Sequence, residues 1–228
     1  MKKLVAVYCF AVCLTVFCSP VSFAQEKLQP KNLFAERDLA KWDFYCVEEG
    51  VKVGDVFSFD SNGVLSCQGK PFGYLAAPSI YKNYKISLEY VWPEGVEPTN
   101  SGVFLRMNAQ PTGSFLPRAV EVQLQHSNAG DIWSFHGMRI EGPKDRHTDN
   151  PNTEFAGAIT GVKKIEGAEK PAGQWNLMEI LVVDSLIVVA VNGKIVNWTN
   201  EADTTPGKIG LQSEGGPIKF RNWIVTEL

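Results

Sequence analysis

The chain has 228 residues, a length that suits one large domain or two small ones. Its 22 basic and 25 acidic residues give a net charge of −3. Nucleic acids and anionic membranes bind basic surfaces, so this balance argues against both as partners, whereas a neutral ligand such as a sugar remains compatible with it.

Residues 1–24 have the pattern of a cleaved secretory signal peptide. A charged start at residues 2–3 precedes an apolar run over residues 4–17, and small residues follow at positions 22 and 24, where a signal peptidase cleaves. The run is too short to span a bilayer, and no longer apolar segment follows it. We therefore expect export to the periplasm or the extracellular space, with Gln25 as the first mature residue and no membrane association afterwards. Loss of the two lysines leaves 20 basic and 25 acidic residues, a net charge of −5.

The mature chain keeps two of the five cysteines, Cys46 and Cys67. In an oxidising compartment they are candidates for one disulfide, which would close a loop of about 20 residues. The alternative is two free thiols. No Cys or His spacing resembles a structural zinc site.

Most of the remaining chain alternates apolar and polar residues with the period of two that is typical of half-buried strands. In the segment 85–92, for example, Ile86, Leu88 and Tyr90 share one face. The same β-rich character recurs in segments 103–107, 120–125, 177–183, 186–191, 194–198, 209–212 and 218–225. Asp184-Ser185 and Asn192-Gly193 separate three of these as predicted two-residue turns.

Many short strands without long helical periodicity predict an all-β fold, an antiparallel sandwich or barrel. No linker divides residues 25–228, so we expect one domain.

The segment 137–171 departs from the strand-like alternation of the rest of the chain, because it is rich in Gly, Pro, Asp, Asn and Lys and has little alternation. We interpret it as one or two extended loops at the sandwich edge.

The segment around Glu121 offers the clearest candidate site. Glu121, Gln123 and Gln125 alternate with Val122 and Leu124, so the acid and the two amides lie in a row on one strand face. Such a row suits sugar hydroxyls, which both donate and accept hydrogen bonds. An ordinary solvated strand face would have the same pattern.

Two charged residues from other segments are further candidates. Arg106 is expected to share a strand face with Phe104, opposite Val103 and Leu105, and its alternative role is a surface salt bridge. Glu214 follows a strand-like segment and could supply the second carboxylate that glycosidases commonly need.

An aromatic and polar cluster follows at residues 131–137. Trp133 could stack on a pyranose ring or pack in the core. Asp131 could bind hydroxyl groups. His136 titrates near neutral pH and could act as an acid or base, or it could be structural.

Several segments, in order, resemble the 3-keto-disaccharide hydrolase domain family. The most specific is Asn100-Ser101-Gly102-Val103-Phe104-Leu105-Arg106. The others are Leu33-Phe34, Lys41-Trp42, Gly73-Tyr74-Leu75, residues 84–90, Glu121-Val122-Gln123-Leu124, Gly173-Gln174-Trp175-Asn176, Val191-Asn192-Gly193-Lys194, Gly210-Leu211-Gln212 and Phe220-Arg221-Asn222-Trp223. Together they cover nearly all of the mature chain.

The resemblance implies a concanavalin-like jelly-roll sandwich with a concave ligand face, and a hydrolase acting on 3-keto-glycosides. By position it implies that Asn100, Arg106, Glu121 and Gln123 line the site. The chain departs from the family at Ser213-Glu214, because the family often has an acid and a His beside the Gly-Leu-Gln segment.

A ketone at C3 of a sugar acidifies the hydrogen on C2, so a base can start an elimination that expels the C1 substituent, and water then adds. This route needs a general base, for which Glu121 is the candidate, and an electrophile at the enolate oxygen, for which Arg106 or His136 is the candidate. A divalent metal could take the latter role, but the sequence contains no evident ligand set.

Two other functional classes remain compatible with this sandwich, since one fold hosts many functions. One is a non-catalytic, lectin-like carbohydrate-binding module, and the other is a structural or interaction domain. An enzyme differs from both in holding a carboxylate or His with a perturbed pKa inside a pocket.

Overall fold

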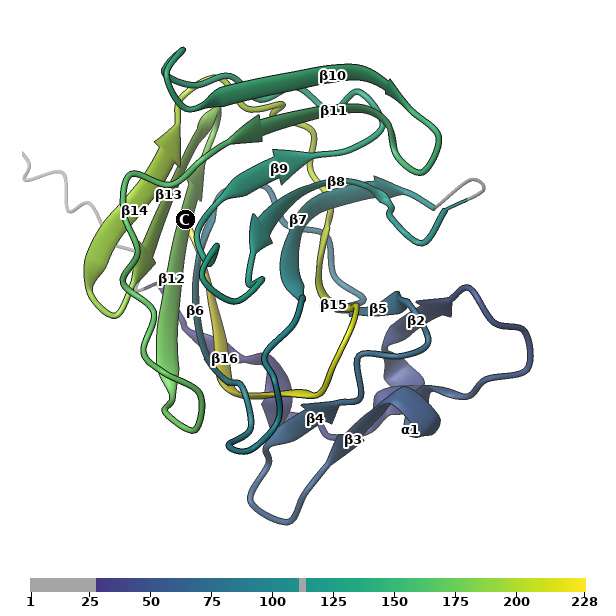
Figure 1. Ribbon diagram of the computed structural model, residues 1–228. Coiled ribbons are helices and arrows are strands. Elements are labelled where there is room, and N and C mark those ends of the chain that lie inside the picture. Colours follow the sequence, from purple (N-terminus) through teal and green to yellow (C-terminus); the bar gives the residue numbers. More distant parts are fainter. Residues whose placement is uncertain (1–27, 111–113) are drawn as a thin grey trace, which may run out of the picture.

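A computed structural model describes residues 28–110 and 114–228; the predicted signal peptide lies outside these residues. The described chain forms two antiparallel sheets of eight strands each, packed face to face (Figure 1). Its one α-helix, α1, spans only Val53–Val56, and 3₁₀ turns cover Leu33–Ala35 and Leu39–Lys41. The prediction of an all-β, antiparallel two-sheet sandwich is confirmed. No helix in the described part of the chain is long and apolar enough to cross a bilayer.

Sheet A has the strand order β14-β13-β12-β6-β16-β4-β3, with β1 paired to β16. Its strands are β1 (Lys31–Asn32), β3 (Phe57–Phe59), β4 (Leu65–Cys67), β6 (Tyr84–Val91), β12 (Asn176–Val183), β13 (Leu186–Val191), β14 (Lys194–Thr199) and β16 (Ile218–Glu227). The two predicted turns join β12 to β13 and β13 to β14. Positive φ angles at Asp184, Asn192 and Gly193 provide the backbone conformation that such tight turns require.

Sheet B has the order β10-β11-β9-β8-β7-β15-β5-β2. Its strands are β2 (Asp43–Cys46), β5 (Gly73–Ala76), β7 (Gly102–Ala109), β8 (Arg118–Gln123), β9 (Ile132–Ser134), β10 (His147–Thr153), β11 (Gly157–Val162) and β15 (Lys208–Ser213). The sheet curves, and its face away from sheet A is concave (Figure 1).

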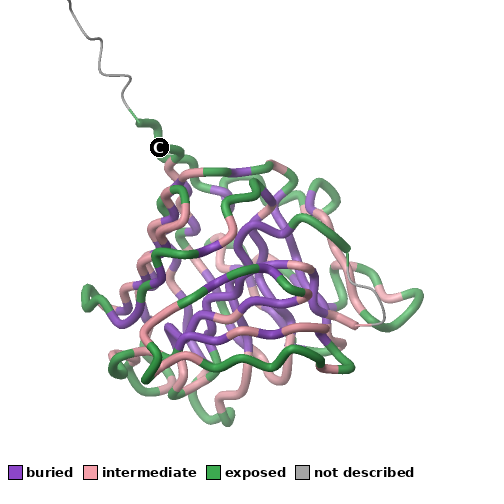
Figure 2. The backbone as a smooth tube through the Cα atoms, turned by 90° about the horizontal axis from the view of Figure 1, so that it is seen from above, coloured by how far each residue is buried: buried purple, intermediate pink, exposed green. Residues whose placement is uncertain are grey.

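The main core fills the space between the sheets. Alternation directs Ile86, Leu88 and Tyr90 of β6 and Val120 and Val122 of β8 into it, all fully buried. Burial is concentrated in the interior of the molecule, and exposed segments surround it (Figure 2). The same alternation sends the intervening residues of β8 to the concave face, where a functional site can form.

A second, smaller apolar cluster lies on the concave face of sheet B. It contains Tyr74, Ala76, Phe104, Met107, Leu116, Ala119, Phe135, Ala156 and Ile159. An outer sheet face open to water is normally polar, so this cluster indicates that the concave face is partly covered. Residues 114–116, which precede β8, contribute to this cover: the hydroxyl of Tyr45 donates to the carbonyl oxygen of Ser114, and Leu116 joins the cluster.

The segment 137–171 was expected to be loops only, and the structure corrects this. It contains β10 and β11, which extend sheet B beyond β9. The sequence of β10, His-Thr-Asp-Asn-Pro-Asn-Thr, is polar throughout because the strand is at the sheet edge and most of its residues are exposed. An exposed strand lacks the alternation by which strands are recognised in a sequence.

The expected disulfide is also wrong, because Cys46 and Cys67 are both free thiols. They lie in different sheets, in β2 and β4. Cys67 is buried, and burial raises the pKa of its thiol to about 11. The thiol of Cys46 donates to the backbone oxygen of Glu48.

We predict that protein beginning at Gln25 contains two titratable thiols after unfolding without a reductant. In the native state only Cys46 should react at neutral pH, because Cys67 is inaccessible and its pKa disfavours the reactive thiolate. Titration with a thiol-specific chromogenic reagent, before and after denaturation, measures both numbers. Absence of thiols in the unfolded, unreduced protein would contradict the structure.

Candidate functional site

A cavity of about 210 Å³ opens on the concave face of sheet B. Its polar lining residues come from the end of β8, from β15 and from the segment before β7, and they are Asn100, Glu121, Gln123, Gln212 and Glu214. Its apolar walls are formed by Phe115, Leu116, Trp133, Phe135, Phe155 and Ile159. The cavity therefore combines a polar cluster, including two carboxyl groups, with aromatic walls.

The structure brings together five of the nine residues proposed from the sequence. Asn100, Glu121, Gln123, Trp133 and Glu214 all line this one cavity. Their convergence follows from register, because Glu121 pairs with Trp133 on β9 and Asn100 forms a β-bridge with Glu214.

Glu121 is seated against the backbone of β7. Its carboxyl group lies over Gly102, where a Cβ atom, if the glycine carried one, would come within 1.9 Å of Oε1. Gly102 is thus needed for space, since any larger residue would occupy the position of the carboxyl group. Only 2% of Glu121 is exposed, and its Oε1 has no hydrogen-bond partner among the described residues.

The environment of Glu121 favours its neutral form. Burial, and secondly the charge of Glu214, raise the pKa of Glu121 well above its usual 4.5. No ion pair in the described part of the chain joins either carboxyl group to a cation. Without such a cation nothing offsets the cost of burying charge, so Glu121 is held protonated further into the neutral range than an exposed glutamate.

Glu214 has a similar but more polar environment. Burial raises its pKa, and the side-chain amides of Asn100 and Gln212 oppose that effect by stabilising the carboxylate. The two carboxyl groups therefore differ, with the proton held more firmly on Glu121 and the charge better accommodated on Glu214. A pair of this kind can provide one acid and one base.

Three buried oxygen atoms at the cavity have no donor among the described residues. They are Oδ1 of Asn100, Oε1 of Glu121 and Oε1 of Gln212. Buried polar atoms in native proteins are normally hydrogen-bonded, so three unpaired acceptors in one cavity indicate a ligand rich in donors. Sugar hydroxyl groups meet that requirement.

Gln123 complements these acceptors. Its Oε1 accepts from the backbone nitrogens of Leu124 (2.9 Å) and Gln125 (2.8 Å). The side-chain carbonyl oxygen of Gln123 is thus already hydrogen-bonded to the backbone. Gln123 therefore presents its amide NH₂ group, a donor, to the cavity.

Trp133 and Phe155 give the cavity large aromatic surfaces. The ring of Trp133 packs over Gly161 of β11, and the Nζ atom of Lys163 lies 4.3 Å from the ring centroid. Phe155 lies in the β10–β11 turn and is 53% exposed, which is unusual for a large apolar side chain. An exposed aromatic ring at the rim of a polar cavity suits the apolar face of a pyranose.

Arg106 does not reach the cavity, and the expected shared face with Phe104 is wrong. The pairing of β7 with β8 shifts register between Leu105 and Ala109, and Arg106 has a φ of 55°. This bulge turns the fully buried Arg106 side chain towards sheet A, where Nη2 donates to the backbone oxygen of Asp184. The guanidinium group of Arg106 thus lies on the interior face of β7, whereas it was expected on the concave face.

Asp131 and Gln125 also lie outside the cavity lining. The carboxylate of Asp131 is buried in an ion pair with Lys163 (3.0 Å) and accepts the backbone NH of Lys164 (2.8 Å). Gln125 is exposed and accepts from the side chain of Asn128. These contacts give Asp131 and Gln125 structural roles in this conformation.

His136 lies beside the cavity without lining it. Its Nε2 is 2.9 Å from the carbonyl oxygen of Leu116, and Leu116 forms part of the cavity wall. The backbone NH of His136 donates to Ala156 in the β10–β11 turn. His136 therefore connects two segments that shape the cavity.

Gln212, Gly102 and Phe155 were not proposed from the sequence. Gln212 is in the Gly210-Leu211-Gln212 motif, and its alternation with buried Leu211 could have placed it on the concave face. The role of Gly102 depends on its cross-strand neighbour Gln123 and on Glu121, so register had to be known first. Phe155 could not be found because its turn was not predicted.

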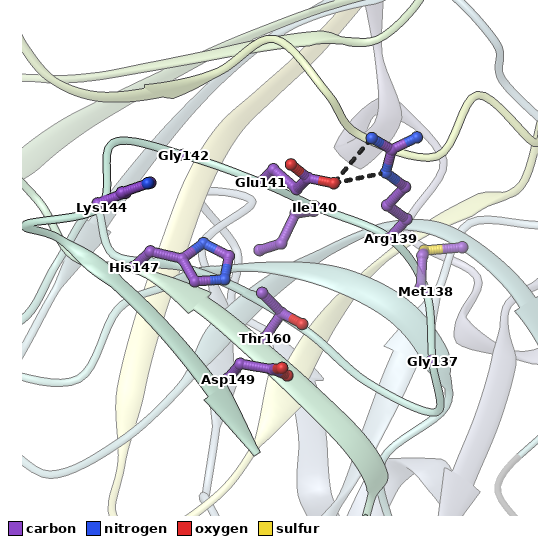
Figure 3. A pocket seen from close by; sticks show the side chains of 10 residues that line it. All are labelled: Gly137, Met138, Arg139, Ile140, Glu141, Gly142, Lys144, His147, Asp149 and Thr160. Atoms are coloured by element: carbon purple, nitrogen blue, oxygen red, sulfur yellow. Dashed lines mark hydrogen bonds and ion pairs between the residues drawn. The ribbon is translucent and has the colours of Figure 1, made fainter. Parts of the chain in front are cut away.

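A larger cavity of about 560 Å³ lies between the segment 137–144 and strands β10 and β11 (Figure 3). Arg139 and Glu141 pair with each other on one side of it, and His147 and Asp149 come from β10 on the other. Glu141 and Asp149 are exposed and therefore solvated. The buried carboxyl group of Glu121 and the partly buried one of Glu214, both with raised pKa values, make the smaller cavity the better candidate for chemistry.

No group of three or more His, Cys, Asp or Glu side chains is placed to hold a metal ion within residues 28–110 and 114–228.

We predict that Gly102→Ala destabilises the protein by about 1–3 kcal/mol, the usual cost of forcing a methyl group into a packed site. Chemical denaturation measures the change in free energy of unfolding. Gly54→Ala is the matched control, because a Cβ atom at Gly54 would meet nothing within 4 Å. Shortening the acid in Gly102→Ala/Glu121→Asp should recover part of the loss. Equal stability of the Gly102→Ala variant and wild type would refute the close contact.

A second prediction concerns pH. The pKa of folded Glu121 is raised above its unfolded value, so its stabilisation is complete below about pH 4.5 and is lost as the pH rises through the folded pKa. Glu121→Gln mimics the neutral acid and should raise Tm at pH 8 by about 2–4 °C per kcal/mol regained, with little effect at pH 4.

Thermal melts at both pH values, with Glu179→Gln on the outer face of sheet A as control, test this. Glu179 is ion-paired to Lys85 at 2.9 Å, so its substitution should not raise Tm at pH 8. A lower Tm for Glu121→Gln at pH 8 would show that the ionised carboxylate is stabilised instead.

Comparison with solved structures shows the fold. A protein from Parabacteroides distasonis with a provisional glycosyl hydrolase assignment is 21% identical, with a TM-score of 0.59 over 88% of this chain and 100% of its own. The carbohydrate-binding module CBM66 from Bacillus subtilis is 8% identical, with a TM-score of 0.56 over 82% of this chain and 96% of its own.

The kappa-carrageenase from Pseudoalteromonas carrageenovora, in complex with an oligotetrasaccharide of kappa-carrageenan, is 11% identical, with a TM-score of 0.52 over 92% of this chain and 98% of its own. These likenesses establish the jelly-roll sandwich. A search of curated protein sequences finds no match.

A family model, in contrast, matches nearly all of the described chain and confirms the resemblance found in the sequence. Residues 29–226 match the 3-keto-alpha-glucoside-1,2-lyase-like domain, and the chain belongs to this 3-keto-disaccharide hydrolase family.

Proposed function

We propose that the protein is an exported carbohydrate-active enzyme that cleaves the glycosidic bond of 3-keto-glycosides, with Glu214 taking a proton from the sugar and Glu121 giving a proton to the leaving group. The observation that carries this proposal is that one cavity holds the buried carboxyl group of Glu121 and the partly buried one of Glu214, with the pKa of Glu121 raised further. Family membership supports the substrate class. The hydrolase or lyase outcome depends on whether water adds to the product of the first step.

The proposed first step is an elimination. The carboxylate of Glu214 takes the proton from C2, which the C3 ketone acidifies. The electron pair of that C–H bond forms the C2–C3 double bond of an enolate, whose C3 oxygen carries the negative charge. The enolate then re-forms the C3 ketone and makes the C1–C2 double bond, the bond from C1 to the leaving oxygen breaks, and the protonated carboxyl group of Glu121 gives that oxygen its proton. The products are an unsaturated keto sugar and an alcohol, and proton exchange restores both residues. Addition of water to C1–C2 would complete a net hydrolysis.

This assignment reverses the role first expected for Glu121. The sequence suggested Glu121 as the base, but a base must be ionised, and burial raises the pKa of Glu121 and so favours its neutral form. The side-chain amides of Asn100 and Gln212 favour the charged form of Glu214. Glu214 is therefore the better base, and Glu121 the better acid.

The enolate oxygen needs a hydrogen-bond donor, and Arg106 is turned away. The NH₂ group of Gln123 is the donor that the cavity offers, because its carbonyl oxygen is already engaged by the backbone. A preformed neutral donor can stabilise developing charge. The acceptors on Asn100 and Gln212 would bind sugar hydroxyl groups, and Trp133 would pack against the ring.

Activity can be measured with a 3-keto-glucoside that carries a chromogenic leaving group. Glu121→Gln and Glu214→Gln should each lower kcat about 100-fold or more, the usual worth of a positioned acid or base, with a smaller change in KM. Glu179→Gln on sheet A is the matched control. Turnover of either cavity variant at the wild-type rate would end its assignment.

The C2 position distinguishes elimination from direct displacement. With deuterium at C2, elimination should slow turnover and release the label to solvent, whereas displacement at C1 should retain the label. A glucoside without the ketone should not react. Equal cleavage of keto and non-keto substrates would remove the reason for this mechanism.

A non-catalytic carbohydrate-binding module is the second candidate, favoured by the aromatic surfaces of Trp133 and Phe155. It predicts no turnover, and weaker sugar binding by Trp133→Ala than by Glu121→Gln. It does not account for the burial of Glu121, which binding alone does not require and which costs stability.

A further inference from the structure

A second hollow lies on the same concave face, on the other side of the aromatic cluster. Its volume is about 510 Å³, and strands β2, β5, β7 and β15 contribute to it. We call it the Asp43–Lys208 groove, after the ion pair on its wall. It shares no lining residue with the cavity that contains Glu121.

Small side chains create this groove. Lys208 on β15 reaches Asp43 on β2 across the intervening strand β5, where Ala76 pairs with Asp43 on one side and with Gly210 on the other. A larger residue at either small position would fill the space beneath the ion pair. The groove therefore has a shallow floor and a charged wall.

Strand register connects the groove to the cavity. Gln212, which lines the cavity, pairs directly with Tyr74, which lines the groove. Glu121 pairs with Phe104, whose ring packs edge-on against Tyr74 with centroids 6.1 Å apart. Neighbouring strands are about 4.8 Å apart, so the two hollows are separated by little more than the width of these aromatic rings.

The groove has the composition expected for a sugar. Asp43 and Lys208 remain partly exposed, with 44% and 34% of their side chains accessible, so both can bind further hydroxyl groups. Ile80 at its rim is 65% exposed, an unexplained apolar surface that could cover one face of a ring. The cavity, at about 210 Å³, is below the usual size of a pocket for a drug-sized ligand and suits a single ring.

From these observations we propose that the Asp43–Lys208 groove binds the leaving-group sugar of a disaccharide whose keto-sugar ring occupies the Glu121 cavity. This inference rests on the proposed function for the cavity. The family already suggests a disaccharide substrate, and what the inference adds is the place of the leaving sugar, a neutral hexose, in a groove outside the cavity. Asp43 and Lys208 would contact hydroxyl groups of that hexose and take no part in proton transfer.

Two substrates with the same keto-glucose unit test the proposal, one with a hexose and one with a methyl group as leaving group. Lys208→Met keeps the apolar stem and removes the charge. It should lower kcat/KM for the disaccharide about tenfold more than for the methyl glycoside, as should Asp43→Asn. The loss should be in KM, since these residues do not touch the reacting atoms.

Lys85→Met is the matched control, because Lys85 forms a similar exposed ion pair with Glu179 on the other sheet. Lys85→Met should leave kcat/KM unchanged for both the disaccharide and the methyl glycoside. Equal losses for both substrates in Lys208→Met, or no loss for either, would overturn the proposal.

Binding distinguishes failure of this inference from failure of the proposed function. With Glu121→Gln as a non-reacting background, calorimetry compares binding of the intact disaccharide with that of the methyl glycoside. The disaccharide should bind more tightly, and Lys208→Met should remove that advantage. If wild type turns over neither substrate but this binding difference is present, the groove proposal stands and the catalytic one fails. If the two ligands bind equally, the groove proposal fails whatever the activity.

Discussion

One cavity holds two carboxyl groups, that of buried Glu121 and that of partly buried Glu214, without a cation among the described residues to neutralise them, and the site depends on this constraint. Charge is costly in a buried setting, so the pKa of each carboxyl group is raised above that of an exposed glutamate. The fold maintains this arrangement through backbone contacts, since Glu121 lies over Gly102 and Glu214 is bridged to Asn100. A rigid sheet thus fixes the separation of the two groups, which a loop would not do as reliably.

One bulge in β7 decides the electrostatics of both faces of sheet B. By turning Arg106 into the interior, it removes the positive charge that would have ionised the carboxyl pair. It also leaves Nε and Nη1 of Arg106 buried without partners among the described residues, a cost to stability. The same register change allows Met107 to join the concave face, where it lies in the lining of the Asp43–Lys208 groove.

Alternation alone predicted much of the fold and part of the site. It placed Ile86, Leu88 and Tyr90 in the core, and it placed Glu121 and Gln123 together on the opposite face of β8, because both consequences follow from a period of two. It failed at Arg106 because a bulge interrupts that period, and at β10 because an exposed edge strand has no apolar face to reveal it. The unequal protonation of Glu121 and Glu214 depends on three-dimensional proximity, which no local pattern encodes.

The position of β10 has a consequence for association between molecules. This strand is the free edge of sheet B, and the turn after it carries Phe155 of the cavity wall. An edge strand offers unpaired NH and CO groups to which another chain could add, but Pro151 lacks an NH group and Asp149 and Asn150 are exposed and polar. Strand β10 is therefore poorly suited to pairing with a neighbour, so the turn after it can expose an aromatic residue at the cavity rim without promoting sheet-to-sheet aggregation.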